Sequence, residues 1–121
     1  MEYLTPEQLQ ELKELLLQRK REVLERINRF VEGDIFKAWA EVGDEIDIAD
    51  REMEREKLLR LRERETRYLR KVEYALKKIE EGTYGICERC GEPIGYERLK
   101  ARPVAIYCIK CKTELEELEE D

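Results

Sequence analysis

The spacing of apolar residues in the first third of the chain predicts a long amphipathic helix. Apolar side chains recur seven residues apart in two neighbouring rows, which place them on one stripe of a helix. The first row is Leu9, Leu16, Val23 and Phe30, and the second is Leu17, Leu24 and Val31. Thr5 and Pro6 are typical of a helix start, and Gln8 is placed to complete a capping box with the threonine. Gly33 is expected to end this helix.

A second, longer helix is expected from Asp44 to Glu81. Asp44 is a suitable N-cap, and Gly82 can adopt the left-handed conformation that often follows a helix. The apolar rows are Leu58, Val72 and Ile79, interrupted by Glu65, and Leu61, Tyr68 and Ala75. Neither helix can bury its stripe alone, so we expect an antiparallel coiled coil. Because residues 51–55 are mostly charged, the end far from the cysteines should be the looser one.

Four cysteines form two Cys-x-x-Cys pairs, Cys87 with Cys90 and Cys108 with Cys111. Two tight pairs joined by a short loop supply the four tetrahedral ligands of a structural zinc ion. Structural disulfides are disfavoured in a reducing cytosol, which leaves redox-active pairs or free thiols as the other interpretation. Gly91, directly after the first pair, permits a turn that directs backbone N–H groups toward the thiolates. The spacing favours one structural zinc ion.

These patterns predict a mainly α fold: a long antiparallel two-helix coiled-coil hairpin with a small four-cysteine zinc ribbon at its base and a short C-terminal helix. The coiled-coil hairpin is expected over residues 1–82, with its tip at about 33–49. The zinc-finger domain is expected over residues 83–121 and includes an acidic C-terminal tail, in which Leu115 and Leu118 share a helical face.

Composition excludes several functions. The chain has no histidine and no serine, so histidine-dependent and serine-dependent catalysis are both impossible, and we expect no enzyme activity. The net charge of −6 argues against direct, sequence-specific DNA binding, which depends on lysines and arginines that neutralise phosphates. No segment approaches the roughly 20 apolar residues that span a bilayer. The chain is expected to be cytoplasmic, monomeric and not associated with membranes.

Two charged regions could carry function. Residues 41–50 contain five carboxylates and no basic residue, together with apolar Ile46, Ile48 and Ala49. Capping of a helix start explains part of this cluster, whereas an exposed acidic and apolar tip would also suit a partner protein. Basic residues lie near the ribbon, and clustered arginine and lysine there could hold a phosphate-rich small ligand.

Three stretches of the sequence resemble the DksA/TraR family, and in particular its full-length members. Asp44-Glu-Ile-Asp47-Ile-Ala49 fits the tip motif D-x-x-D-x-A of the family. Tyr84-Gly85-Ile-Cys87-Glu-Arg-Cys90-Gly91 resembles the opening of its four-cysteine zinc finger. Leu99-Lys-Ala101-Arg102-Pro103 and Cys108-Ile-Lys-Cys111-Lys112 resemble its end.

The resemblance implies a transcription factor that binds RNA polymerase. It implies that the coiled coil enters the secondary channel, that Asp44, Asp47 and Ala49 contact the polymerase, and that initiation is modulated together with guanosine tetraphosphate (ppGpp). It also implies a ppGpp site at the polymerase interface formed by three basic residues. These residues are Lys71, Arg102 and Lys112.

Two other functions remain open from the residues alone. A transcript-cleavage factor of the Gre or TFIIS type would use tip carboxylates to help hold a catalytic Mg²⁺. A coiled-coil interaction adaptor with a structural zinc ion would need no functional tip. Cleavage of RNA in a backtracked complex would identify a cleavage factor. Absence of binding to RNA polymerase would identify an interaction adaptor.

Overall fold

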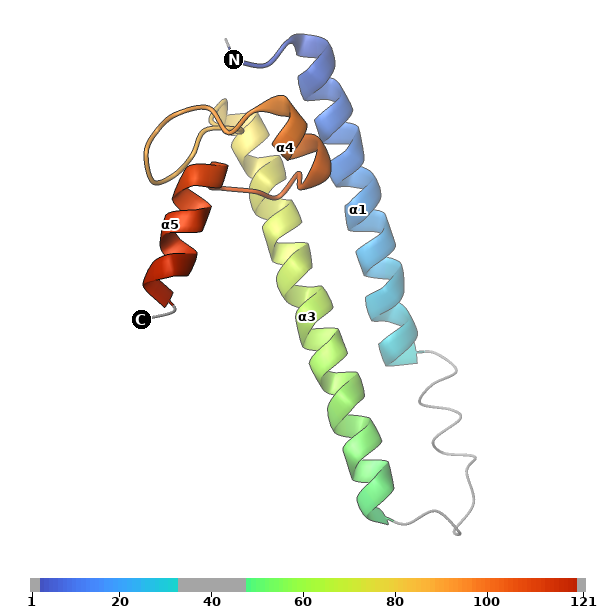
Figure 1. Cartoon of the computed structure of the whole chain (residues 1–121). Coiled ribbons are helices and arrows are strands. Elements are labelled where there is room, and N and C mark those ends of the chain that lie inside the picture. The colour runs from blue at the N-terminus through green and yellow to red at the C-terminus, as the bar shows by residue number, and fades with distance from the viewer. Residues whose placement is uncertain (1–2, 33–47, 120–121) are drawn as a thin grey trace. The chain divides into compact units, whose positions relative to one another are not determined.

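The computed structural model describes residues 3–32 and 48–119 (Figure 1). The fold is mainly helical, as the sequence predicts, and the chain order of its helices in these ranges is α1 (Pro6–Glu32), α3 (Ile48–Glu81), α4 (Tyr96–Ala101) and α5 (Ile109–Glu119). Strand pairing in the described residues is limited to one isolated antiparallel bridge between Ile86 and Pro93. The turn expected at residues 33–43 and the helix start expected at Asp44 lie outside the described residues.

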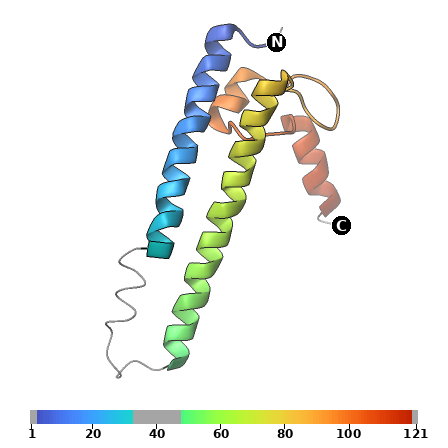
Figure 2. The ribbon, with the colours of Figure 1, turned by 180° about the vertical axis from the view of Figure 1, so that it is seen from behind.

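The chain divides into two compact units. The finger unit consists of Met1–Gln18 and Lys71–Asp121, and the shaft unit consists of Arg19–Arg70. Each unit contains one segment of α1 and one segment of α3, and within each unit these segments run side by side in opposite directions (Figures 1 and 2). The expected antiparallel pairing of the two long helices is therefore present in both units.

Two of the four predicted helix-end signals, those at Thr5 and Gly82, lie in the described residues, and both are found in the structure. The Thr5 N–H donates to Gln8 Oε1 and the Gln8 N–H donates to Thr5 Oγ1, each at 3.0 Å, which confirms the capping box before α1. At the end of α3, Gly82 has a φ of 78° and its N–H donates to the Ile79 carbonyl. The Thr83 N–H donates to the Lys78 carbonyl at 3.0 Å, so a Schellman motif ends the helix.

The finger unit contains most of the buried side chains of the described residues. In the helices its core consists of Leu12, Leu16, Val72 and Ala75, and in the finger it consists of Tyr84, Cys87, Ile94, Leu99 and Cys111, with Leu4 before α1. Helix α4 is joined to α1 by a hydrogen bond from Tyr96 Oη to Glu11 Oε2 at 2.6 Å. The first turns of α1 and the last turns of α3 thus share one apolar core with the finger.

The shaft unit has a much smaller apolar core. Val23 is its one fully buried side chain among the described residues. At the position where Glu65 interrupts the apolar row of α3, its Oε1 lies 3.0 Å from Arg26 Nε of α1, although the two are not aligned as a hydrogen bond. An ion pair therefore replaces an apolar layer here. The scarcity of buried apolar side chains agrees with the expectation of a looser distal end.

The second apolar row of α1 is less buried than its spacing suggests. Leu17 and Leu24 are 37% and 39% exposed, whereas Leu16 and Val23 are fully buried. With only one long helix beside it, α1 needs a narrower apolar stripe than a helix enclosed by several neighbours. In the ranges 3–32 and 48–119, no helix combines the length and apolar character needed to cross a bilayer.

Candidate metal centre

The first cysteine pair lies in a tight loop after the Schellman turn. The Cys87 N–H donates to the Glu92 carbonyl at 2.8 Å, and the Gly91 N–H donates back to the Cys87 carbonyl at 2.9 Å. Gly91 has a φ of 78°, a conformation that costs glycine little. The loop therefore favours glycine at the position where the sequence places it, and it leaves Cys87 buried and Cys90 exposed.

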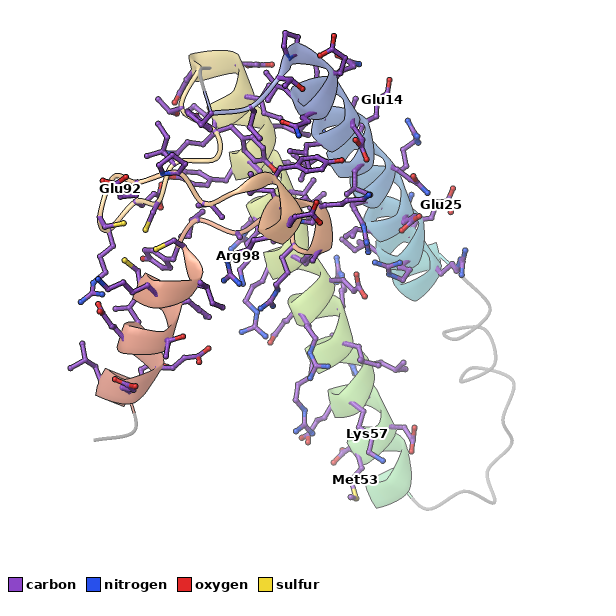
Figure 3. The ribbon with its side chains drawn as sticks, turned by 45° about the horizontal axis from the view of Figure 1, so that its top comes forward. Glu14, Glu25, Met53, Lys57, Glu92 and Arg98 are labelled. Carbon is purple, nitrogen blue, oxygen red and sulfur yellow. The ribbon has the colours of Figure 1, made fainter. Side chains whose placement is uncertain are left out.

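The second cysteine pair begins α5. Cys108 directly precedes the helix, and its carbonyl accepts a hydrogen bond from the Lys112 N–H at 2.9 Å. Upstream, Arg98 Nε donates to the Tyr107 carbonyl at 3.1 Å and so fixes the approach to Cys108. Figure 3 shows Arg98 on α4 and Glu92 in the loop of the first pair. Three local structures, a loop, a short helix and a helix start, together position the thiols.

The four thiols meet at one point. The Sγ atoms of Cys87, Cys90, Cys108 and Cys111 all lie within 4.8 Å of one another. Cys90 Sγ and Cys108 Sγ are 3.8 Å apart, and all four cysteines are free of disulfides. A tetrahedron of thiolates around zinc, with Zn–S bonds of about 2.3 Å, has edges of about 3.8 Å. The donor set and its spacing fit one tetrahedral zinc ion.

The surroundings shift the pKa values of Cys87 and Cys111 in opposite directions. Burial raises the pKa of Cys87, but backbone N–H groups of Cys90, Cys108 and Arg89 outweigh it and lower this pKa to about 6. Burial raises the pKa of Cys111 to about 12, and the neighbouring thiols add to the rise, while a hydrogen bond from Arg89 lowers it. Metals bind the thiolate form of cysteine. The backbone N–H groups around Cys87 favour that form. At Cys111, burial and the neighbouring thiols disfavour the thiolate form.

The two residues between Cys87 and Cys90 contact different helices. Glu88 accepts a hydrogen bond from Tyr74 Oη, and its carboxylate lies 3.0 Å from Lys78 Nζ on α3. Arg89 pairs with Glu114 on α5. These contacts lower the pKa of Glu88, chiefly through the tyrosine hydrogen bond, and raise the pKa of Lys78, chiefly through its bond to Glu88. The loop is thus tied to the helices on both sides of the sulfur cluster.

The structure describes some, but not all, of the other predicted site residues. Asp44 and Asp47 lie outside the described residues, and Ala49 is in the first turn of α3. Lys71 is exposed on α3, while Arg102 is the exposed C-cap of α4. Lys112 lies on α5 with its Nζ 3.9 Å from Glu116. In the described part of the chain, no hydrogen bond or ion pair joins Lys71, Arg102 and Lys112 to a common partner.

Several residues of the centre carried no recognisable signal in the sequence. Helix α4 is only six residues long, too short for its apolar period to be read. The contacts of Glu88 and Arg89 join residues that are 14 and 25 positions apart along the chain. Long-range polar pairs of this kind leave no periodic pattern. Their position between two metal-binding cysteines was the one available hint.

The fold and the sulfur cluster define a class: mainly helical proteins with two long paired helices and a four-cysteine zinc finger. Comparison with known proteins agrees. Residues 8–79 match the family "DnaK suppressor protein DksA, N-terminal domain", and residues 82–117 match the family "Prokaryotic dksA/traR C4-type zinc finger". The chain belongs to the DksA family, and zinc is the metal of its finger.

Individual relatives cover nearly the whole chain. An RNA polymerase-binding transcription factor DksA of Salmonella typhimurium is 40% identical over 112 residues, which are 93% of this chain and 74% of the relative. An uncharacterized protein of Aquifex aeolicus is 43% identical over 112 residues, 91% of this chain and 77% of that protein. The structure of the transcription factor DksA2 from Pseudomonas aeruginosa has a TM-score of 0.87 at 37% identity and covers 98% of this chain and 91% of its own.

Proposed function

We propose that this chain is an RNA polymerase-binding transcription factor. The observation that carries the proposal is its continuous similarity, over 93% of its length, to proteins named for that function. It acts as a single chain in the cytoplasm, where its polymerase partner works, and modulates initiation without catalysing a reaction. It does not bind DNA directly in a sequence-specific way, in keeping with a net charge of −6.

The proposal assigns separate tasks to the two parts of the sequence. Residues 1–82 form the coiled-coil hairpin that enters the secondary channel of the polymerase, and residues 83–121 form the zinc-finger domain. The separate family matches at 8–79 and 82–117 support this boundary. The four cysteines Cys87, Cys90, Cys108 and Cys111 are the zinc ligands, for which their clustering is the support.

The test of the proposal uses the purified zinc-loaded chain and the RNA polymerase of the same organism. We expect the chain to co-sediment with core polymerase and to change transcription from a ribosomal RNA promoter, with a larger change when ppGpp is added. Failure to bind polymerase would leave the interaction-adaptor function. Cleavage of the nascent RNA in a backtracked complex would instead favour the Gre or TFIIS type of activity.

The acidic tip is expected to act on the polymerase rather than to provide affinity. In the Asp44→Asn and Asp47→Asn proteins, asparagine preserves side-chain size and most of the capping ability. We therefore expect promoter regulation to be lost while polymerase binding stays within about three-fold of the parent protein. In-vitro transcription and a competition binding assay measure the two quantities. The Asp50→Asn protein, which changes a carboxylate outside the motif, is the control, and unchanged regulation by Asp47→Asn would contradict the assignment.

The ppGpp response is proposed to depend on Lys71, Arg102 and Lys112. All three belong to the finger unit, and Arg102 and Lys71 have exposed side chains available to phosphates. Because polymerase supplies the other wall of the site, the isolated chain should bind ppGpp weakly. The Lys71→Ala and Arg102→Ala proteins should show a flattened ppGpp titration in transcription. Lys77→Ala, which removes an exposed lysine of the same helix, should titrate normally, and a normal response in the first two would refute the site.

A further inference from the structure

The metal centre has a cation beside it that the four-cysteine motif does not require. Arg89 lies between Cys87 and Cys90, and its Nη1 is paired with Glu114 Oε2 on α5. Glu114 in turn lies on the helix that carries Cys111. Cys111 and Glu114 are three residues apart on α5 and therefore lie on one side of that helix. One arginine thus connects the loop of the first cysteine pair to the helix that carries a ligand of the second pair.

The chemistry of a four-thiolate centre makes such a contact useful. A zinc ion with four thiolates carries a net charge of about −2, and hydrogen bonds from outer groups orient the ligands and offset that charge. Arginine presents several donors in a planar fork that matches a carboxylate, so an arginine–glutamate pair fixes the geometry of the two segments it joins. Glu114 pairs with the guanidinium, and Cys111, one turn earlier on the same helix, is buried.

We propose that Arg89 is a positioning residue of the metal centre, which through its pair with Glu114 ties α5 to the loop of the first cysteine pair, keeps Cys111 in its ligating orientation and thereby slows the loss of zinc. The proposal rests on the zinc finger and not on polymerase binding, and it is tested without polymerase. If zinc retention proves independent of Arg89, the proposed transcriptional function is unaffected. If the chain does not bind polymerase, the role of Arg89 is unaffected.

The chain offers matched controls for charge and for loop contacts. Lys110 lies between the second cysteine pair as Arg89 lies between the first, but its side chain is exposed and has no ion pair with any described residue. Lys110→Ala removes the same charge at the same sequence distance from a ligand. Glu88→Gln weakens the contact of the loop to Lys78 on α3 and leaves the contact to α5. The first control isolates net charge, and the second isolates the general attachment of the loop.

The experiment measures zinc release from the full zinc-loaded chain. The protein is challenged with excess EDTA, and zinc retained by the protein is measured over time. In parallel, zinc affinity is obtained by competition with the indicator 4-(2-pyridylazo)resorcinol. Loss of an outer-shell partner typically lowers metal affinity 10–100-fold, so Arg89→Met, which keeps much of the side-chain volume, should lower affinity by about 10-fold or more. Arg89→Lys and Glu114→Gln should have intermediate effects.

The controls decide between a specific contact and a general effect. Lys110→Ala and Glu88→Gln should stay within about two-fold of the parent protein. Equal losses in Arg89→Met and Lys110→Ala would overturn the proposal in favour of net charge, and parental affinity in Arg89→Met would overturn it outright. The absorption spectrum of the Co²⁺-substituted proteins reports the ligand field directly. An altered spectrum in Arg89→Met alone supports a role in orienting Cys111, and identical spectra and affinities in all variants exclude one.

Discussion

The Cys90→Ser protein is expected to contain almost no zinc and to lose the folded structure of residues 84–112. Serine keeps the shape of the side chain but removes a thiolate from a set whose four sulfurs lie within 4.8 Å of one another. Apart from the cysteines, the finger buries few large side chains, among them Tyr84, Ile94 and Leu99. Zinc binding should therefore supply most of its folding free energy, on the order of 10 kcal/mol. Elemental analysis and circular dichroism measure both consequences.

The remainder of the Cys90→Ser protein should stay largely helical. The capping box of α1 and the shaft unit do not involve the cysteines, so much of the far-ultraviolet helical signal should persist. Glu92→Gln serves as the control, because it changes an exposed side chain of the same loop and leaves every sulfur in place. One equivalent of zinc in purified Cys90→Ser would show that the four-thiolate assignment is incorrect.

A second large effect is expected from Leu16→Ala. Leu16 is fully buried in the finger unit, and removing three carbon atoms there leaves a cavity. Substitutions of this kind cost about 2–5 kcal/mol. The free energy of unfolding of the zinc-loaded protein, measured by urea titration, should fall by an amount in this range.

The neighbouring leucine is the matched control for this measurement. Leu17 is 37% exposed, so Leu17→Ala should lower the free energy of unfolding by less than about 1 kcal/mol. Both substitutions change helix propensity equally, and their difference therefore isolates burial. Equal losses in the two proteins would mean that Leu16 and Leu17 are equally buried, which would contradict the structure.

The parts of the fold that were predictable are those with local signals. Thr5 and Gln8 form their reciprocal hydrogen bonds, and Gly82 adopts the left-handed conformation expected of it. Such signals depend on residues a few positions apart, which the sequence displays directly. The two Cys-x-x-Cys pairs were equally readable, because their chemistry restricts them to a few structures.

Features that depend on distant contacts were not predictable. Seven-residue spacing identified the apolar side of α1 but did not reveal that Leu17 and Leu24 lie at its exposed edge. The roles of Glu88 and Arg89 depend on partners on α3 and α5, which only the folded chain brings near. Polar contacts across long sequence distances have no periodicity, so a single sequence does not reveal them.

The ion pair between Arg26 and Glu65 has a consequence for the alignment of α1 and α3. Apolar heptads are similar to one another, so a slip of α3 by seven residues would cost little contact energy on its own. Such a slip would place Arg26 opposite the apolar side chain of Leu58 or Val72 and would break its pair with Glu65. A polar pair within an apolar seam penalises these alternatives more than it stabilises the native state. The pair therefore encodes which residues of the two helices face each other, and a continuous stripe of leucines would leave that choice open.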